Sequence, residues 1–234
     1  MNERSLSKEQ LDDLSLRGEQ LNHALRSLAW INRWFGNTRS AISIIEKLHT
    51  DKNSPLKLTD LGCGGGDVAL AIGQALRKKG IPFSITGIDG NEHTLAIARS
   101  VCASCPDIRF EKADILDPGF SLDACDILFS SHFMYHFREE ALVSFLQKNR
   151  AAVSTAFICN ELERSSVALR LFRWFAFLFP ISRMARQDGQ LAIRRSFTKK
   201  EWIALFEKAG IAHYRIRRVP LFRLQVIIFP RQTR

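Results

Sequence analysis

Apolar and polar positions follow two different spacings along this chain. Between residues 6 and 35, apolar and aromatic residues recur every three or four positions, which predicts a helix with an apolar stripe. Asn37 or Thr38 is placed to cap a second helix. A turn-rich segment, HTDKNSP at 49–55, separates these helices from the rest of the chain. Residues 1–50 are therefore expected to form a helical segment of their own.

After residue 55, short apolar runs alternate with helical spacing. Such runs open the segments that begin at residues 58, 83, 108 and 123, and the first two continue into helical patterns. Near the end, Thr198 and Glu201 form a capping box for a helix that Gly210 closes, and a strand pair follows at 212–219 and 222–229. Strands alternating with helices predict an α/β domain, in which ligands bind at the carboxyl ends of the strands.

The break between the first strand and its helix, LTDLGCGGGD at 58–67, carries most of the chemical information. A dinucleotide-binding turn would need a glycine where Asp67 stands, and a P-loop would need a lysine and a hydroxyl that are missing. The pattern that remains, D-x-G-x-G-x-G from Asp60 to Gly66, resembles motif I of the class I S-adenosylmethionine-dependent methyltransferases. The acid there suits the ammonium group of the cofactor, and the glycines let the backbone approach its methionine portion.

Three further segments resemble the same family, in the order that the family has. Asp89 ends the second strand, where the family places an acid that accepts the ribose hydroxyls, and Asp114 with Ile115 resembles its adenine-binding pair. The segment at 123–137 resembles motif IV, whose end faces the transferred methyl group. The resemblance implies S-adenosylmethionine as the cofactor, bound by Asp60, Gly62, Cys63, Gly64, Gly66, Asp89, Gly90, Asp114, Ile115 and Ser130.

The family's fold then becomes the expectation for residues 55–234. It is a Rossmann-like sheet of seven strands in the order 3-2-1-4-5-7-6, with the last strand antiparallel and helices on both faces. Residues 1–50 are expected to form a helical cap over the active site. Residues 161–195 are expected to form a helical lid inserted after strand five.

Two histidines just past strand four are the candidates for acid–base chemistry. An oxygen nucleophile benefits from a general base, and His132 and His136 stand where they can face the methyl group. His132 is the first choice, because family members often carry a histidine without a catalytic role at the position of His136. A catechol-type enzyme would need carboxylates at the ends of strands four and five to hold Mg²⁺. Strand four ends in Ser130 and Ser131, so no metal is expected.

Composition limits the class of protein. A chain of 234 residues with 46% hydrophobic residues suits one folded domain with a sizeable core. Residues 1–160 carry 18 basic and 19 acidic groups, whereas residues 161–234 carry 16 basic and 5 acidic groups. Such asymmetry points to nucleic acid, a membrane surface or an anionic substrate. Residues 1–20 are charged and polar rather than signal-like, so a cytoplasmic protein is expected.

The segment SSVALRLFRWFAFLFPISRMARQ, 165–187, narrows those options. It is too short and too charged to span a bilayer, and its Trp, Phe, Leu and Arg content is that of a helix at a membrane interface or over an apolar pocket. Packing on the sheet as a core helix and burial in a dimer interface remain open. The residues expected to line the substrate pocket are Trp30, Trp34, Ser131, Phe133, Tyr135, Asn160, Glu161 and Trp174.

The sequence thus predicts an enzyme that O-methylates an apolar aromatic small molecule. Segments 160–165 and 187–202 also resemble bacterial methyltransferases that act on phenolic, polyketide or quinone-like substrates. Monomer and homodimer both remain open, peripheral membrane contact is considered, and nucleic acid is not an expected partner. Two alternatives stand: methylation of RNA or protein through the basic last third, and a non-catalytic cofactor-binding protein that docks to lipid or a partner.

Overall fold

The computed structural model describes residues 1, 3–51 and 53–230, and its centre is a seven-stranded sheet. The strands lie in the order β3-β2-β1-β4-β5-β7-β6, and only β7 runs against the others. This order and the reversed strand confirm the sequence prediction. The strands are β1 (Leu56–Leu61), β2 (Phe83–Asp89), β3 (Ile108–Lys112), β4 (Cys125–Ser131), β5 (Val153–Leu162), β6 (Tyr214–Val219) and β7 (Arg223–Ile228).

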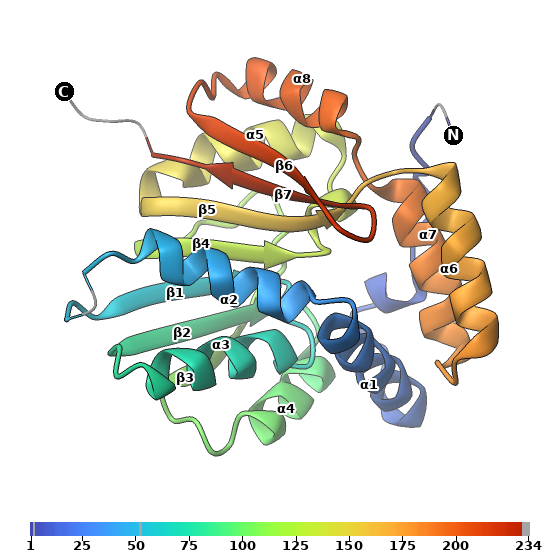
Figure 1. Ribbon diagram of the computed structural model, residues 1–234, viewed down its shortest axis with the longest axis horizontal. Coiled ribbons are helices and arrows are strands. Elements are labelled where there is room, and N and C mark those ends of the chain that lie inside the picture. Colours follow the sequence, from blue (N-terminus) through green and yellow to red (C-terminus); the bar gives the residue numbers. More distant parts are fainter. Residues whose placement is uncertain (2, 52, 231–234) are drawn as a thin grey trace.

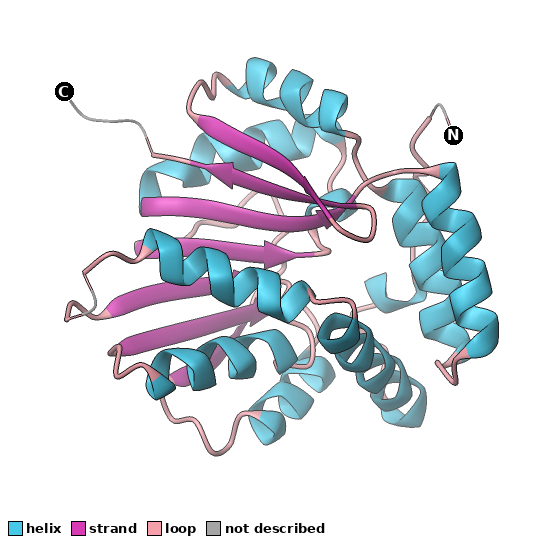
Figure 2. Ribbon diagram, viewed as in Figure 1, coloured by secondary structure: helices cyan, strands magenta, loops and turns pink. Residues whose placement is uncertain are grey.

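Helices cover both faces of the sheet (Figure 2). The predicted capping box of Thr198 and Glu201 begins the last of them, and Gly210 ends it. The α-helices are α1 (Gly18–Trp34), α2 (Asn37–Leu48), α3 (Asp67–Lys78), α4 (Glu92–Val101), α5 (Glu139–Asn149), α6 (Ser166–Leu178), α7 (Arg183–Arg195) and α8 (Lys199–Ala209). Short 3-10 turns are η1 (Gln10–Asp12), η2 (Met134–His136) and η3 (Arg150–Ala152).

The core lies in two layers, one on each side of the sheet. Because successive strand residues point to opposite faces, Ile127 and Phe129 of β4 join the layer beneath α2 and α3, and Leu128 joins the layer beneath α5 and α8. Trp202 of α8 is fully buried in the second layer. These two layers hold the carboxyl ends of the parallel strands in fixed positions along one edge of the sheet.

The N-terminal segment corrects the helix predicted over residues 6–35. Only Gln10–Asp12 form a short 3-10 turn, and regular helix begins at Gly18. The reason is a tertiary contact: the carboxylate of Asp188 on α7 accepts hydrogen bonds from the backbone N–H groups of Gln10 and Leu11, at 3.0 and 3.1 Å. The segment therefore runs as a strap against α7, and its apolar spacing did not reveal this.

The start of the second helix also differs from the prediction. Gly36, in a left-handed conformation, occupies the N-cap of α2, and neither Asn37 nor Thr38 caps the helix with its side chain. Within residues 1–50, Ala41 and Ile45 of α2 pack into the core on the sheet. In the same segment, α1 is the last element that lies away from the sheet (Figure 1).

The apolar segment at 165–187 is two helices rather than one. Helix α6 ends at Leu178, and α7 begins at Arg183 after a bend that contains Pro180. The two helices pack against each other closely, since a Cβ at Gly189 would collide with the ring of Phe172. Figure 1 shows α7 on the inner side and α6 on the outside of the molecule, beyond the carboxyl ends of the strands.

Candidate active site

A large cavity of about 670 Å³ lies at the carboxyl ends of β1, β2 and β4. This volume is within the range of small-molecule sites, roughly 300–1,000 Å³. The strand ends and the glycine turn form one side, and α1, α6, α7 and the N-terminal strap form the other. The cavity therefore joins parts of the chain that are far apart in sequence.

The glycine turn after β1 forms the floor of one half of the cavity. Gly62 has a φ of +67°, and a Cβ placed on it would lie 2.5 Å from the ring of Phe133. Gly64 also has a positive φ, and a Cβ there would meet nothing within 4 Å. One glycine is thus required by close packing with the β4 end, and the other leaves backbone open to a ligand.

Two carboxylates flank this turn. Asp60 is 2% exposed, and burial, together with the nearby charges of Asp67 and Asp89, raises its pKa well above the ordinary range. Asp89 accepts hydrogen bonds from the backbone N–H groups of Gly64 (3.2 Å) and Asn91 (2.9 Å), and burial raises its pKa too. Buried acids of this kind favour a cationic or hydroxyl-bearing ligand, which would satisfy oxygens that the protein leaves without a cation.

The end of β4 brings His132 to the cavity in an unusual conformation. Its φ is +55°, which is uncommon for a residue with a side chain, and its backbone N–H donates to the carbonyl of Asn160 at 3.0 Å. Burial and the positive charge of Arg223 lower the pKa of His132 to about 3. This imidazole is therefore neutral, and it is a weak base.

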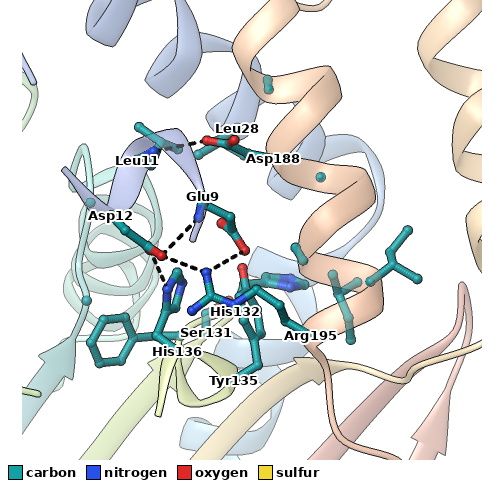
Figure 3. A pocket seen from close by; sticks show the side chains of 18 of the residues that line it. Glu9, Leu11, Asp12, Leu28, Ser131, His132, Tyr135, His136, Asp188 and Arg195 are labelled. Carbon is teal, nitrogen blue, oxygen red and sulfur yellow. Dashed lines mark hydrogen bonds and ion pairs between the residues drawn. The ribbon is translucent and has the colours of Figure 1, made fainter. Parts of the chain in front are cut away.

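His136 has different surroundings, which Figure 3 shows from close by. Its Nδ1 lies 2.6 Å from Oδ1 of Asp12, and the second oxygen of Asp12 lies 2.7 Å from the Arg195 guanidinium. Burial lowers the pKa of His136, whereas the hydrogen bond and charge of Asp12 raise it. The pKa of Asp12 is held below its usual range, because the hydrogen bonds from His136 and Arg195 outweigh its burial.

Glu9 completes this cluster from the N-terminal strap. Its carboxylate lies 3.5 Å from Arg195, and burial raises its pKa to about 9. Ligand atoms of Glu9, Asp12 and His136 lie within 4.8 Å of one another, a spacing that would suit a metal ion. The guanidinium of Arg195 contacts both acids, and because Glu9 keeps its proton at neutral pH, Arg195 balances the charge of Asp12.

A layer of polar side chains supports the strand ends from behind. The amide of Asn37 donates to Ser131 Oγ (2.6 Å) and to Asn32 (3.2 Å), and Asn32 in turn donates to Asp67 (3.1 Å). Glu161 accepts hydrogen bonds from the backbone N–H groups of Phe133 and Met134, and burial raises its pKa to about 7. These bonds fix the backbone that carries both histidines.

The other half of the cavity is mostly apolar. Its lining there comes from α1 and the residue after it, the end of β5, α6, α7 and the β6–β7 turn: Leu28, Ile31, Phe35, Leu162, Ala168, Leu171, Phe172, Phe175, Ala192, Ile193, Leu221 and Phe222. The ring of Phe175 packs edge-on against Phe35, with centroids 4.7 Å apart. This half suits a ligand whose surface is largely hydrocarbon or aromatic.

Most of the residues named from the sequence line the cavity. These are Asp60, Gly62, Cys63, Gly64, Asp89, Gly90, Asp114, Ile115, Ser131, His132, Phe133, Tyr135 and His136. Seven do not line it: Gly66, Ser130, Asn160, Glu161, Trp30, Trp34 and Trp174.

Each of these seven placements has a physical reason. Gly66 packs against Ala98 and Phe110 in the helix layer, and Ser130, Asn160 and Glu161 are buried behind the strand ends. Trp30 stacks on the ring of Phe175, which itself lines the cavity, and Trp34 and Trp174 are 69% and 68% exposed. The sequence predicts the three tryptophans in the pocket because it does not show which face of α1 and α6 turns inward.

Ten other residues that line the cavity are not predicted from the sequence. They are Arg4, Glu9, Asp12, Asn32, Asn37, Phe172, Phe175, Asp188, Arg195 and Arg223. The N-terminal acids lie before the first regular helix, in the stretch where the sequence predicts helix. Local spacing gave no signal that Asp12 and His136, or Glu9 and Arg195, would meet.

Comparisons with known proteins agree with the fold and the turn. Residues 58–155 match a family model described as a methyltransferase domain. No curated protein sequence matches the chain significantly.

Solved structures that resemble the chain include three proteins whose names refer to a small molecule. The citrinin polyketide synthase CMeT domain has 15% identity and a TM-score of 0.62, over 82% of this chain and 52% of that one. The pyocyanin biosynthetic protein PhzM has 21% identity and a TM-score of 0.58, over 81% and 54%. Magnesium protoporphyrin IX methyltransferase from Synechocystis, solved with S-adenosylhomocysteine bound, has 16% identity and a TM-score of 0.54, over 83% and 84%. This chain spans about half the length of the first two.

Proposed function

We propose that this chain, which has the class I methyltransferase fold and a methyltransferase domain at residues 58–155, methylates an oxygen atom of an apolar, aromatic small molecule. S-adenosylmethionine is the cofactor. One observation carries the proposal: a single cavity combines the glycine turn and acidic strand ends in one half with an apolar, aromatic lining in the other.

Three features of the acidic half support cofactor binding there. Gly64 leaves open backbone, and the buried Asp60, whose charged neighbours are the acids Asp67 and Asp89, suits the ammonium of an amino-acid end. Asp89 would accept the ribose hydroxyls and Asp114 with Ile115 would hold the adenine, and all three line the cavity. When bound, the cofactor supplies a methyl group on a sulfonium sulfur, activated toward a nucleophile.

The apolar half would hold the acceptor by burial rather than by charge. Phe172 and Phe175 contribute aromatic side chains to the lining of this half, and the ring of Phe133 lies next to Gly62 of the glycine turn. Holding the acceptor oxygen in line with the methyl group is the main contribution that a protein makes to such a transfer. The aromatic lining is the reason to propose an aromatic acceptor.

His136 is the better-placed general base, which reverses the preference drawn from the sequence. With its Nδ1–H donated to Asp12, its Nε2 keeps a lone pair that can take the proton of a phenol. Asp12 acts as a positioning residue, because it fixes the ring and stabilises the charged form. His132 remains the alternative base, but the neighbouring Arg223 opposes the positive charge that a base acquires.

The strap and the α6–α7 insertion would exclude water from the transfer. Arg4 donates to the carbonyls of Tyr135 (2.8 Å) and Arg195 (2.7 Å), so the strap is tied to both the β4 end and α7. We regard residues 3–34 as the cap and 161–195 as the lid of the proposed enzyme. The outward apolar residues of α6 favour peripheral contact with a membrane.

Methyl transfer from labelled S-adenosylmethionine tests the proposal. Phenols with apolar substituents, matched anilines, total RNA and a protein mixture are offered as acceptors. Label on the phenols, lost in His136→Gln and retained in part by His132→Gln, is the expected result. Label that appears on RNA or protein instead would replace the proposed acceptor class.

A further inference from the structure

We propose that the exposed face of α6 docks on an anionic phospholipid bilayer, and that the methyl acceptor enters the cavity from that bilayer. The docking stands on the surface itself. The route of the acceptor rests on the proposed function.

The α6 face is defined by Val167, Leu171, Trp174, Phe177 and Leu178. Val167, Leu171, Trp174 and Leu178 follow one another at intervals of four, three and four residues, so they share one side of the helix. Phe177, beside them, is 76% exposed, which is the highest exposure among the large apolar residues that the structure describes. Helix α6 is also the outermost element on its side of the molecule (Figure 1). An apolar stripe that points outward is unusual for a folded domain and marks an interaction surface.

The charges around this face fit an anionic partner. Residues 164–187 contain five arginines and no acidic residue. Arg170, Arg173 and Arg183 are exposed on α6 and at the start of α7. A second copy of this chain would bring the same arginines toward one another in a two-fold contact, which like charges oppose. Anionic headgroups attract the arginines while the apolar side chains enter the headgroup region.

The docking face continues into the cavity. Leu171 belongs to the α6 face and also lines the cavity, together with Leu221 and Phe222 at the β6–β7 turn. Leu221 and Phe222 have φ values of +66° and +55°, a conformation that bulky residues rarely adopt. The turn thus holds two apolar side chains at the rim against their backbone preference. An apolar molecule leaving a bilayer at this rim would remain in contact with apolar side chains.

The geometry fits contact with one leaflet rather than insertion. No helix in the described ranges is long and apolar enough to cross a membrane. Helix α6 has 13 residues, and its inward residues Ala168, Leu169 and Ala176 are buried against the protein. Only the outward side of the helix is available, which is the arrangement of an interfacial helix.

Sedimentation with vesicles tests the docking without any methyl acceptor. The full chain is mixed with vesicles of phosphatidylcholine, with or without about one third phosphatidylglycerol. Trp174→Glu and Phe177→Glu each remove one outward apolar residue that does not line the cavity, and Val101→Glu, on α4, is the matched control. Binding of S-adenosylmethionine to every variant, measured by calorimetry, reports whether the fold is intact.

The expected result is binding to the anionic vesicles, reduced about tenfold or more by each α6 substitution and unchanged by Val101→Glu. Arg170→Gln is expected to weaken binding about fivefold. Equal binding by wild type and the α6 variants would overturn the proposal. So would a stable dimer that Trp174→Glu dissociates, because the face would then be covered by a second copy.

The two parts of the proposal fail separately. If vesicles bind through α6 but no acceptor is methylated, the docking stands and the proposed function falls. If soluble phenols are methylated and vesicles do not bind, the function stands and the docking falls. For the route of entry, acceptor dissolved in anionic vesicles is expected to be methylated more slowly by Phe177→Glu than by Val101→Glu. Equal rates would contradict entry from the bilayer.

Discussion

Replacing Asp12 with asparagine isolates the residue that links the N-terminal strap to the candidate base. The Asp12–His136 contact is 2.6 Å long, and the two side chains are only 17% and 12% exposed, so solvent screens it little. A hydrogen bond to a charged group, here the Asp12 carboxylate, contributes about 1.5–3 kcal/mol. At 1.36 kcal/mol per tenfold change in rate, kcat of Asp12→Asn is expected to fall by about 10- to 100-fold.

The pH dependence of methyl transfer distinguishes a role of Asp12 in positioning His136 from a purely structural role. The charge of Asp12 raises the pKa of His136, so its removal lowers that pKa further. A base must be neutral to act, and activity therefore rises with pH through this pKa. The acidic limb of the pH profile should move to lower pH in Asp12→Asn, while kcat at its plateau decreases. The assay is methyl transfer to a phenol at saturating S-adenosylmethionine across the pH range.

Asp188→Asn provides the matched control for this experiment. Asp188 holds the same strap through the N–H groups of Gln10 and Leu11, but it is not among the groups that shift the pKa of His136. It is expected to loosen the strap and leave the acidic limb where it is. If Asp12→Asn and Asp188→Asn lower activity equally with no shift of the limb, Asp12 only anchors the strap, and the role assigned to His136 is refuted.

Three substitutions test other parts of the structure. Gly62→Ala places a Cβ against the Phe133 ring at positive φ and should weaken S-adenosylmethionine binding about tenfold or more by calorimetry, whereas unchanged affinity would mean that the turn tolerates a side chain. Gly189→Ala should displace Phe172 and raise KM for the acceptor with little change for the cofactor, and an unaltered KM would contradict the proposed substrate half. The pKa of Glu161 is raised to about 7 from the ordinary 4.5, so between these two pH values the native state keeps a proton that the unfolded chain releases. The free energy of unfolding is therefore expected to fall by roughly 3 kcal/mol as pH rises through that window. Glu161→Gln keeps both backbone hydrogen bonds and should reduce the loss, measured by urea unfolding at about pH 5 and about pH 7. An identical pH dependence would show that Glu161 is ionised in the native state throughout.

The sheet could be predicted because its signals are local. The apolar runs, the capping box of Thr198 and the turn from Asp60 to Gly66 each lie within a few residues, and the family resemblance supplies the strand order. The cofactor half of the cavity follows from the same segments. Whether a strand is buried on both faces, and where it ends, can be read from residues that are neighbours in the sequence.

The acceptor half depends on contacts that no local pattern encodes. Residues 6–17 do not form the predicted helix, and the backbone N–H groups of Gln10 and Leu11 donate instead to Asp188, far along the chain. The face of α6 that turns inward was equally hidden, so Trp174 was placed in the pocket and Phe175 was not. Where apolar residues occupy both sides of a helix, spacing cannot show which side meets the ligand.

The decisive experiment for the proposed activity is transfer of label from S-adenosylmethionine to a panel of apolar phenols. We expect labelled methyl ethers, formed by the wild type and lost in Asp89→Ala, since that substitution removes the acid proposed to hold the ribose. Failure of the wild type to bind S-adenosylmethionine, or label found on RNA or protein and never on a phenol, would contradict the proposed activity.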